Sequence, residues 1–215
     1  MLSRIFNSHK YLFLFLLLSP GLWQIFFHLP VAAQEWLSFP ARVPRNVTSK
    51  LASPYFTYID ELRWGGRSLH RNSPLSRVLY NQSWGVLNET FDFIQFVTPK
   101  LYFAAGDGSV FSPARIEPIP SILFPLWVVG LIYVVKNCRY KVFGLLLVAV
   151  LPAYLAGSKN LALLAPVLVV HAYICAVGFT SLFSRRLTRL PATAVVSLYG
   201  LYVVAMNLWF NFAQR

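Results

Sequence analysis

Acidic side chains are scarce in this sequence, which has seven Asp and Glu among 215 residues, against 19 Lys and Arg. Charged residues make up 12% of the chain and hydrophobic residues 57%, a composition far from that of soluble domains. The formal net charge of +12 would suggest a nucleic-acid partner in a soluble protein. The chain lacks a basic, aromatic-interleaved recognition motif, and its basic residues lie mainly beside apolar segments. We therefore expect no nucleic-acid partner.

Cysteine is also rare. Cys138 lies in a predicted turn and Cys175 inside a predicted helix. Because the two cannot easily meet, no disulfide framework is expected, and both are interpreted as packing residues. The sequence has no EF-hand motif and no His/Cys cluster, so we predict neither a metal site nor a cofactor.

Long apolar runs are what the chain has in abundance. Four of them, at residues 119–135, 142–157, 161–183 and 190–212, are separated by short basic or glycine-bearing turns. They contain no Asp, Glu, Lys or Arg, and a spanning helix needs about 20 mostly apolar residues. Since lipid cannot solvate backbone polar groups, these runs must be helices that satisfy their own hydrogen bonds.

A further apolar run covers residues 11–29. The stretch after it, residues 30–34, is similar to a signal-peptide cleavage region, but the run is longer than a usual secretory core. We therefore predict an uncleaved anchor. Ser19-Pro20-Gly21 should kink it, because Pro20 lacks a backbone donor.

The Lys and Arg content of short loops predicts the orientation. With the N-terminus inside, the cytoplasmic pieces are basic, and the long outer segment, residues 31–117, holds every acidic residue. The predicted cytoplasmic basic residues are Arg4, Lys10, Lys136, Arg139, Lys141, Arg185, Arg186 and Arg189, and the short outer pieces carry Lys159 and Arg215.

The sequence thus predicts an all-α multi-pass membrane protein with about five transmembrane helices. Its parts are an N-terminal anchor (residues 1–30), a small, mainly helical extracytoplasmic segment (31–117) and a four-helix transmembrane bundle (118–215). So short a segment buries little core, so we expect it to cap the bundle. Within it, helices are expected over residues 54–70, after Asn72-Ser73-Pro74, and over 86–97. Interfacial or lipid-facing aromatic side chains are expected at Trp127, Tyr133, Tyr154 and Trp209.

Candidate acid–base residues are few. Asp60 and Glu61 could activate an acceptor hydroxyl as a general base, although a helix surface that pairs Asp60 with Arg63 is the plainer interpretation. Asp107 lies between two glycines and could hold a metal or a sugar hydroxyl, but Asp and Gly also favour a turn.

Three other side chains lie in or beside the apolar runs. An ionisable side chain inside a membrane helix, such as His171, is a candidate functional residue because such side chains are costly to place there. The alternatives are a neutral ring bonded to a neighbouring carbonyl, or a ligand to a pigment or haem in a partner chain. Arg115 and Lys159 flank the predicted outer membrane face, where they could contact lipid phosphates or head groups, or simply snorkel.

The outer segment also carries Asn-x-Ser/Thr sequons, a weak signal, at Asn46, Asn81 and Asn88.

Part of the outer segment is similar to a known family. Residues 73–82 (SPLSRVLYNQ) are followed by residues 91–103 (FDFIQFVTPKLYF) and then by Gly106-Asp107-Gly108, and a proline-containing stretch leads into run 119–135. This order resembles the C-terminal part of the GT-C membrane glycosyltransferases, the protein-mannosyltransferase-like and aminoarabinose-transferase-like enzymes. The resemblance covers residues 50–180.

The resemblance implies a polyprenyl-phosphate-linked sugar as donor, with basic groups such as Lys159 and Arg115 on its phosphate. Family members have many more spans, and their catalytic acid lies in the first external loop. Nothing in this chain aligns with that loop, so the resemblance implies ancestry and argues against autonomous activity.

We therefore expect a non-catalytic integral membrane protein, an accessory or structural subunit of a larger membrane complex, derived from a truncated GT-C glycosyltransferase. A bundle with almost no intramembrane polar pathway argues against a transporter or channel. The expected partners are the lipid bilayer and other integral membrane subunits. The alternatives are the working part of a split glycosyltransferase with a polyprenyl-phosphate-linked donor and, more weakly, a lipid-binding or assembly factor.

Overall fold

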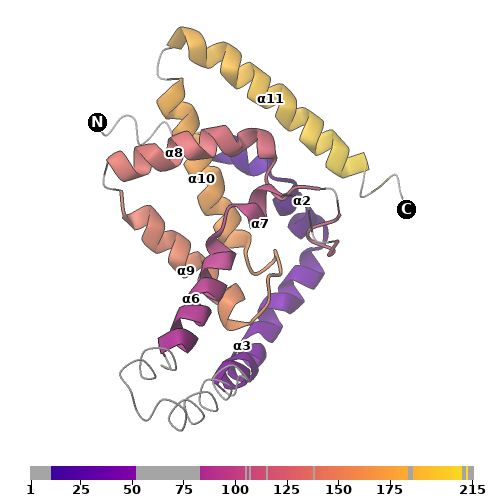
Figure 1. Cartoon of the computed structure of the whole chain (residues 1–215). Coiled ribbons are helices and arrows are strands. Elements are labelled where there is room, and N and C mark those ends of the chain that lie inside the picture. Colours follow the sequence, from indigo (N-terminus) through magenta and orange to yellow (C-terminus); the bar gives the residue numbers. More distant parts are fainter. Residues whose placement is uncertain are drawn as a thin grey trace.

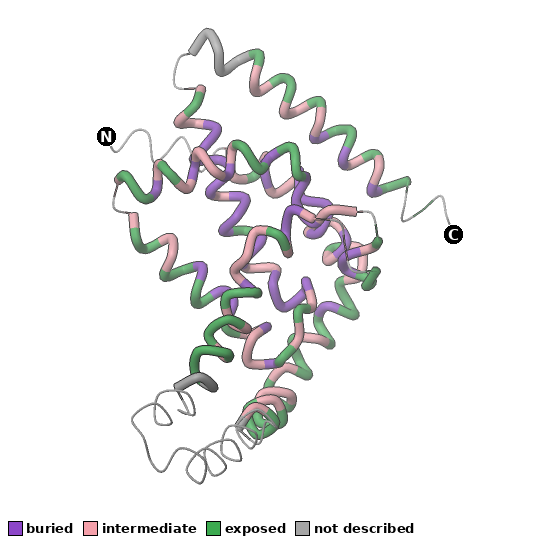
Figure 2. The backbone as a smooth tube through the Cα atoms, viewed as in Figure 1, coloured by how far each residue is buried: buried purple, intermediate pink, exposed green. Residues whose placement is uncertain are grey.

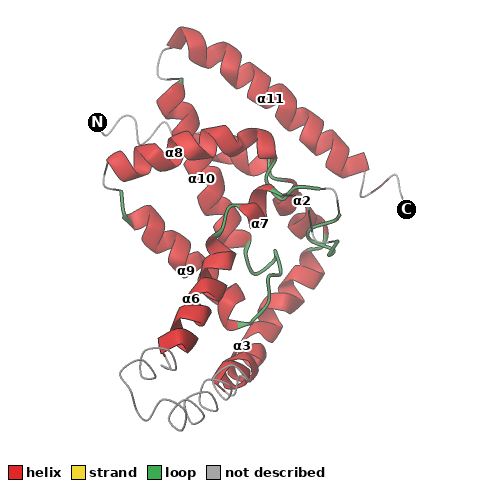
Figure 3. Cartoon of the chain, in the orientation of Figure 1, coloured by secondary structure: helices red, strands yellow, loops and turns green. Residues whose placement is uncertain are grey.

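The computed structural model describes residues 11–51, 83–104, 106, 108–114, 116–137, 139–183, 186–209 and 212. Helices make up most of this part of the chain, and a longer irregular segment joins α7 (Lys100–Phe103) to the short 3-10 helix η1 (Ser121–Leu123) (Figures 1 and 3). It holds no β-strand, and its only β-pairing is two isolated bridges, Gly106–Ala114 and Ser109–Ser112. The all-helical fold class is confirmed for these residues, whereas the helices expected over 54–70 and after Ser73 lie outside them.

The first apolar run is interrupted at the predicted place. Residues 11–17 are helical, and a new helix, α2 (Pro20–Phe27), begins after Ser19. Ser19 is extended (φ −90°, ψ 104°), and its hydroxyl accepts a hydrogen bond from the Leu22 N–H at 3.4 Å. Proline suits the first turn of a helix, where its missing N–H has no partner to lose. The expected kink is therefore a complete break between two helical pieces.

Helix α3 (Leu29–Leu51) follows α2 after a break at His28 and contacts α9 (Lys141–Leu155) (Figure 1). It crosses the boundary expected at residue 30, and the sequence analysis predicted no helix over residues 31–51. Pro40 and Pro44 lie inside it on exposed positions. Exposure lets water hydrate the carbonyl groups that lose their helical donor.

Each of the four long apolar runs coincides with most of one helix. These are α8 (Phe124–Lys136), preceded by the short 3-10 helix η1 (Ser121–Leu123), then α9 (Lys141–Leu155), α10 (Ala165–Leu182) and α11 (Arg186–Leu208). Before them come α6 (Ser83–Val97), which contains the predicted helix over 86–97, and the one-turn helix α7 (Lys100–Phe103).

Helix α10 forms the centre of the core, and Figure 2 shows buried residues along most of its length. Its tightest contact is with α8, at two glycines. A Cβ atom added to Gly178 would lie 1.8 Å from the Leu126 carbonyl oxygen, and one added to Gly130 would lie 2.0 Å from that of Ile174. Small residues let helix backbones approach closely, so the two glycines set the distance between these helices.

Trp127 corrects one of the sequence-based expectations. It was predicted to be interfacial or lipid-facing, but it is buried between α8 and α10. Its indole N–H donates to His171, a partner that the membrane interface would not supply. Trp209 is 70% exposed, as expected of a lipid-facing residue.

Two helices are long and apolar enough to span a membrane, at residues 165–182 and 191–208. The helices at residues 121–136 and 141–155 are apolar but shorter. The two candidate spans differ in surroundings, because the first is mostly buried inside the protein whereas only 17% of the second is buried.

The glycine contact between α8 and α10 makes a direct prediction. Gly178→Ala places a methyl group against backbone that cannot rotate away, so we expect a loss of about 1–3 kcal/mol of stability. Gly144→Ala, on α9, is the matched control because no atom lies within 4 Å of its added Cβ. Thermal unfolding in detergent compares the two, and an equal effect of both variants would contradict the close helix contact.

Candidate functional site

The outer segment is joined to the helical bundle by a polar cluster of three side chains. Lys50 of α3 forms an ion pair with Glu89 of α6, and the Tyr154 hydroxyl of α9 donates to the same carboxylate oxygen at 3.1 Å. The Lys50 ammonium also lies 4.2 Å from the centroid of the Tyr154 ring. The pKa of Lys50 is raised, because hydrogen bonds to Glu89 and Tyr154 outweigh the lowering caused by burial. The cluster therefore fixes three helices to one another through charge-assisted contacts.

Asn46 caps the end of α9 from the side. Its amide nitrogen donates to the carbonyl oxygens of Tyr154 and Leu155 at 3.2 and 3.1 Å. Gly157 follows in the left-handed region (φ 64°), and a Cβ there would lie 2.3 Å from the Asn46 amide oxygen. The first sequon asparagine thus serves as a structural cap. Asn88 is exposed on α6, and Asn81 lies outside the described residues.

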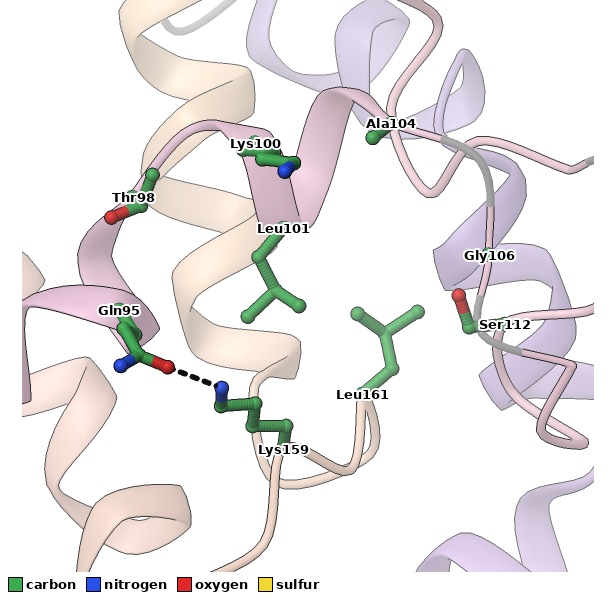
Figure 4. A pocket seen from close by; sticks show the side chains of 9 residues that line it. All are labelled: Gln95, Thr98, Lys100, Leu101, Ala104, Gly106, Ser112, Lys159 and Leu161. Atoms are coloured by element: carbon green, nitrogen blue, oxygen red, sulfur yellow. Dashed lines mark hydrogen bonds between the residues drawn. The ribbon is translucent and has the colours of Figure 1, made fainter. Parts of the chain in front are cut away.

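A cavity of about 420 Å³ lies between the α6–α7 junction and the loop from α9 to α10. Lys159 extends into this region and donates to Gln95 at 2.7 Å, as Figure 4 shows. Leu101 and Leu161 face each other across the space in the same view. The wall therefore combines lysine, amide and hydroxyl groups with alkyl side chains: Gln95, Thr98, Lys100, Leu101, Ala104, Gly106, Ser112, Lys159 and Leu161.

Tyr102 holds the turn that carries Lys100. It is fully buried, and its hydroxyl donates to the Phe96 carbonyl across the junction between α6 and α7. Burial raises the pKa of Tyr102, so the phenol stays protonated and keeps its donor role. The Ile119 N–H donates to the Tyr102 carbonyl at 2.8 Å and joins this turn to the approach to α8.

His171 is completely buried in α10. Its Nδ1 lies 2.9 Å from the Trp127 indole nitrogen, and an indole N–H can only donate, so Nδ1 is the acceptor and the ring is neutral. Its partner is thus a side chain and not the carbonyl considered from the sequence. Among the described residues Nε2 has no hydrogen-bond partner, and the ring centroid is 4.5 Å from that of Tyr102.

Only part of the predicted site can be located. Lys159 lines the cavity, and His171 lies in the core away from the cavity lining. Asp60, Glu61, Asp107 and Arg115 lie outside the described residues. In the part of the chain that the structure describes, no group of three or more His, Cys, Asp or Glu side chains is placed to hold a metal ion.

Two residues of these contacts, Lys100 and Glu89, are not predicted from the sequence. Lys100 lies 59 positions before Lys159 (159 − 100), and only the fold brings both to one cavity. Its signal was Thr98-Pro99-Lys100, where a proline predicts a helix start and places Lys100 in the following turn. Glu89 was assigned only to a sequon, although an acidic residue on a partly apolar helix is a candidate for an ion pair.

Comparisons with protein-family models, with curated proteins and with solved structures found no match for this chain. The resemblance to GT-C glycosyltransferases stays a prediction from the sequence motifs.

The Lys50–Glu89 pair predicts a pH-dependent stability. Because the folded-state pKa of Lys50 is raised above 10.5, the pair contributes fully below that pH and is lost as pH rises through the raised value. Glu89→Gln should therefore cost about 1 kcal/mol at pH 7, and the cost should shrink above pH 10.5.

Thermal unfolding at neutral and strongly alkaline pH measures this difference. Asp92→Asn, one turn further along α6, is the control and should change stability by about 0.5 kcal/mol or less. An identical cost of Glu89→Gln at both pH values would show that Lys50 is not the partner that matters.

Proposed function

We propose that this chain is a non-catalytic integral membrane protein that acts as an accessory or structural subunit of a larger membrane complex. The observation that carries the proposal is the outer surface of α11. Leu198 and Leu201 are each 66% exposed, and the exposed positions recur at helical spacing. This surface favours a lipid-covered helix over the core helix of a soluble protein. Over residues 191–212, the described large side chains that are exposed are apolar or aromatic: Val195, Leu198, Leu201, Tyr202, Leu208, Trp209 and Phe212.

Other helices also carry exposed apolar side chains. On α9, side chains that include Leu145 (58% exposed) and Val148 (63% exposed) point outward, and Ile132 and Val135 do so on α8. Large exposed apolar side chains on several helices are typical of a membrane or protein interface. We therefore include α8, α9 and the first apolar run among the spans. This gives about five spans, with residues 31–117 outside.

The described carboxylates support a non-catalytic role, because each is engaged in a local contact. Glu35 pairs with Arg42, and Glu89 with Lys50. Asp92 accepts from the side-chain amide of Gln95 at 3.4 Å, and Glu117 accepts from the Ser121 N–H in the turn before α8. A general acid or base must face a substrate cavity with its proton within reach. Asp92 lines a cavity of about 330 Å³, and we assign it a structural role because it accepts from Gln95 there.

The alternative function is the working part of a split glycosyltransferase with a polyprenyl-phosphate-linked sugar donor. The observation in its favour is the lysine-lined cavity beside the predicted outer membrane face. The two functions differ in whether carboxylates of this chain take part in chemistry.

The proposed orientation is tested by cysteine labelling in intact cells. In a Cys138→Ser background, an impermeant maleimide should label Asn88→Cys without permeabilisation and Lys141→Cys only after it. Both positions are exposed, and Cys175 is buried, so accessibility depends on the side of the membrane. The reverse labelling pattern would contradict the orientation.

The accessory role is tested by deleting the chain from its own cells and extracting the membranes gently. We expect the tagged chain to recover other integral membrane subunits in fixed stoichiometry, and their complex to be lost on deletion. A triple variant, Asp60→Asn, Glu61→Gln and Asp107→Asn, should restore the complex and its activity completely.

The opposite results are equally clear. Restored assembly without restored transferase activity in the triple variant would favour the split enzyme. Recovery of a lone monomer with transferase activity would end the accessory proposal.

A further inference from the structure

We propose that the cavity between the α6–α7 junction and the α9–α10 loop binds the phosphate head group of an anionic phospholipid, held by Lys100 and Lys159. The inference rests on the membrane location proposed above and names the ligand class of this site.

The first argument is uncompensated charge. Among the described residues, the ion pairs join Arg42 to Glu35 and Lys50 to Glu89, and neither lysine of the cavity takes part. Lys159 donates instead to the neutral Gln95 amide at 2.7 Å. An ammonium group has three donors, so Lys159 retains donors for an anion. A phosphate would supply a negative charge that none of the described ion pairs gives these lysines.

The orientation of Gln95 supports this arrangement. Its amide nitrogen donates to Asp92 at 3.4 Å, so its oxygen is the atom that accepts from Lys159. The Lys159 ammonium also lies 5.7 Å from the centroid of the Phe96 ring. The side chain is thus held over the cavity by a neutral amide and an aromatic ring, and the positive charge stays available.

The second argument is the mixed character of the wall. Hydroxyl groups of Thr98 and Ser112 and the two lysines suit a phosphate, whereas Leu101, Ala104 and Leu161 offer alkyl surface. In Figure 4 the two leucines face each other across the space beside Lys159. A free phosphate would leave this alkyl surface uncovered, whereas the first carbons of a lipid would cover it. The cavity of about 420 Å³ accommodates a head group but not a whole lipid.

A second cavity of about 330 Å³ adjoins the first, because Gln95 and Lys159 line both. Its wall also includes Asn46, Asp92 and Tyr154. A group attached to the phosphate beyond Lys159 therefore has space and polar partners. This arrangement favours a phosphodiester with a hydroxyl-bearing substituent, such as a glycerol head group.

The test measures retention of phosphatidylglycerol and phosphatidylcholine by the purified full-length chain in mixed micelles, using native mass spectrometry. The wild-type chain should retain phosphatidylglycerol in preference to phosphatidylcholine. The double variant Lys100→Gln, Lys159→Gln should bind phosphatidylglycerol about tenfold more weakly, because two charge-assisted contacts are lost. The control, Lys136→Gln with Lys141→Gln, removes the same charge at the ends of α8 and α9 remote from the cavity, and should bind normally.

Each other outcome overturns the site. Unchanged binding by the Lys100/Lys159 variant, or equal loss in both double variants, would show general attraction of anionic lipid to a basic protein. Displacement of the lipid by excess inorganic phosphate, with no preference between the two lipids, would assign the lysines to a free anion. Resistance of each variant to alkaline carbonate extraction is measured separately, so failure of membrane insertion is distinguished from failure of the head-group site.

Discussion

The close approach of α8 to α10 determines where most other elements lie. With Gly130 and Gly178 at the contact, each helix packs its backbone against a carbonyl of the other. Trp127, almost one turn before Gly130, is then directed at His171, and their hydrogen bond satisfies a polar group in the core. In a lipid environment helices gain little from burying apolar side chains, so close packing and such hydrogen bonds supply the association energy.

The residues just before α8 form hydrogen bonds that position α2 and α7. The Pro118 carbonyl accepts from the Ser19 hydroxyl at 2.8 Å and from the Gly21 N–H at 3.0 Å, which positions the start of α2. The next residue, Ile119, donates to Tyr102 and positions α7. Lys100 therefore owes its place beside the α9–α10 loop to a few backbone contacts around Pro118.

The sequence predicts the helices much better than their contacts. The apolar runs located the four later helices because a long uncharged apolar run favours a helix, in which the backbone groups bond to one another. Helix α3 was not predicted because Pro40 and Pro44 normally indicate helix ends. Their exposed positions in α3 let water hydrate the carbonyl groups that lose a helical donor. The burial of Trp127 escaped because α10 is apolar on all sides, so hydrophobic periodicity does not show which face meets α8. Lys100 and Lys159 line one cavity although they are far apart in the sequence, and no local sequence pattern predicts this.

The position of Lys159 gives the cavity its significance. In the proposed orientation it lies in a short outer loop, where a basic residue opposes the tendency of Lys and Arg to remain inside. A lysine on the outer side reduces the excess of basic residues in the cytoplasmic loops. Its partner, Gln95, is neutral and does not offset the lysine charge. A lysine retained against this bias and held over a partly apolar cavity is better explained by an anion at the membrane surface than by snorkelling. The four described carboxylates agree with this interpretation, because each has a local contact and none of the described ion pairs includes Lys100 or Lys159.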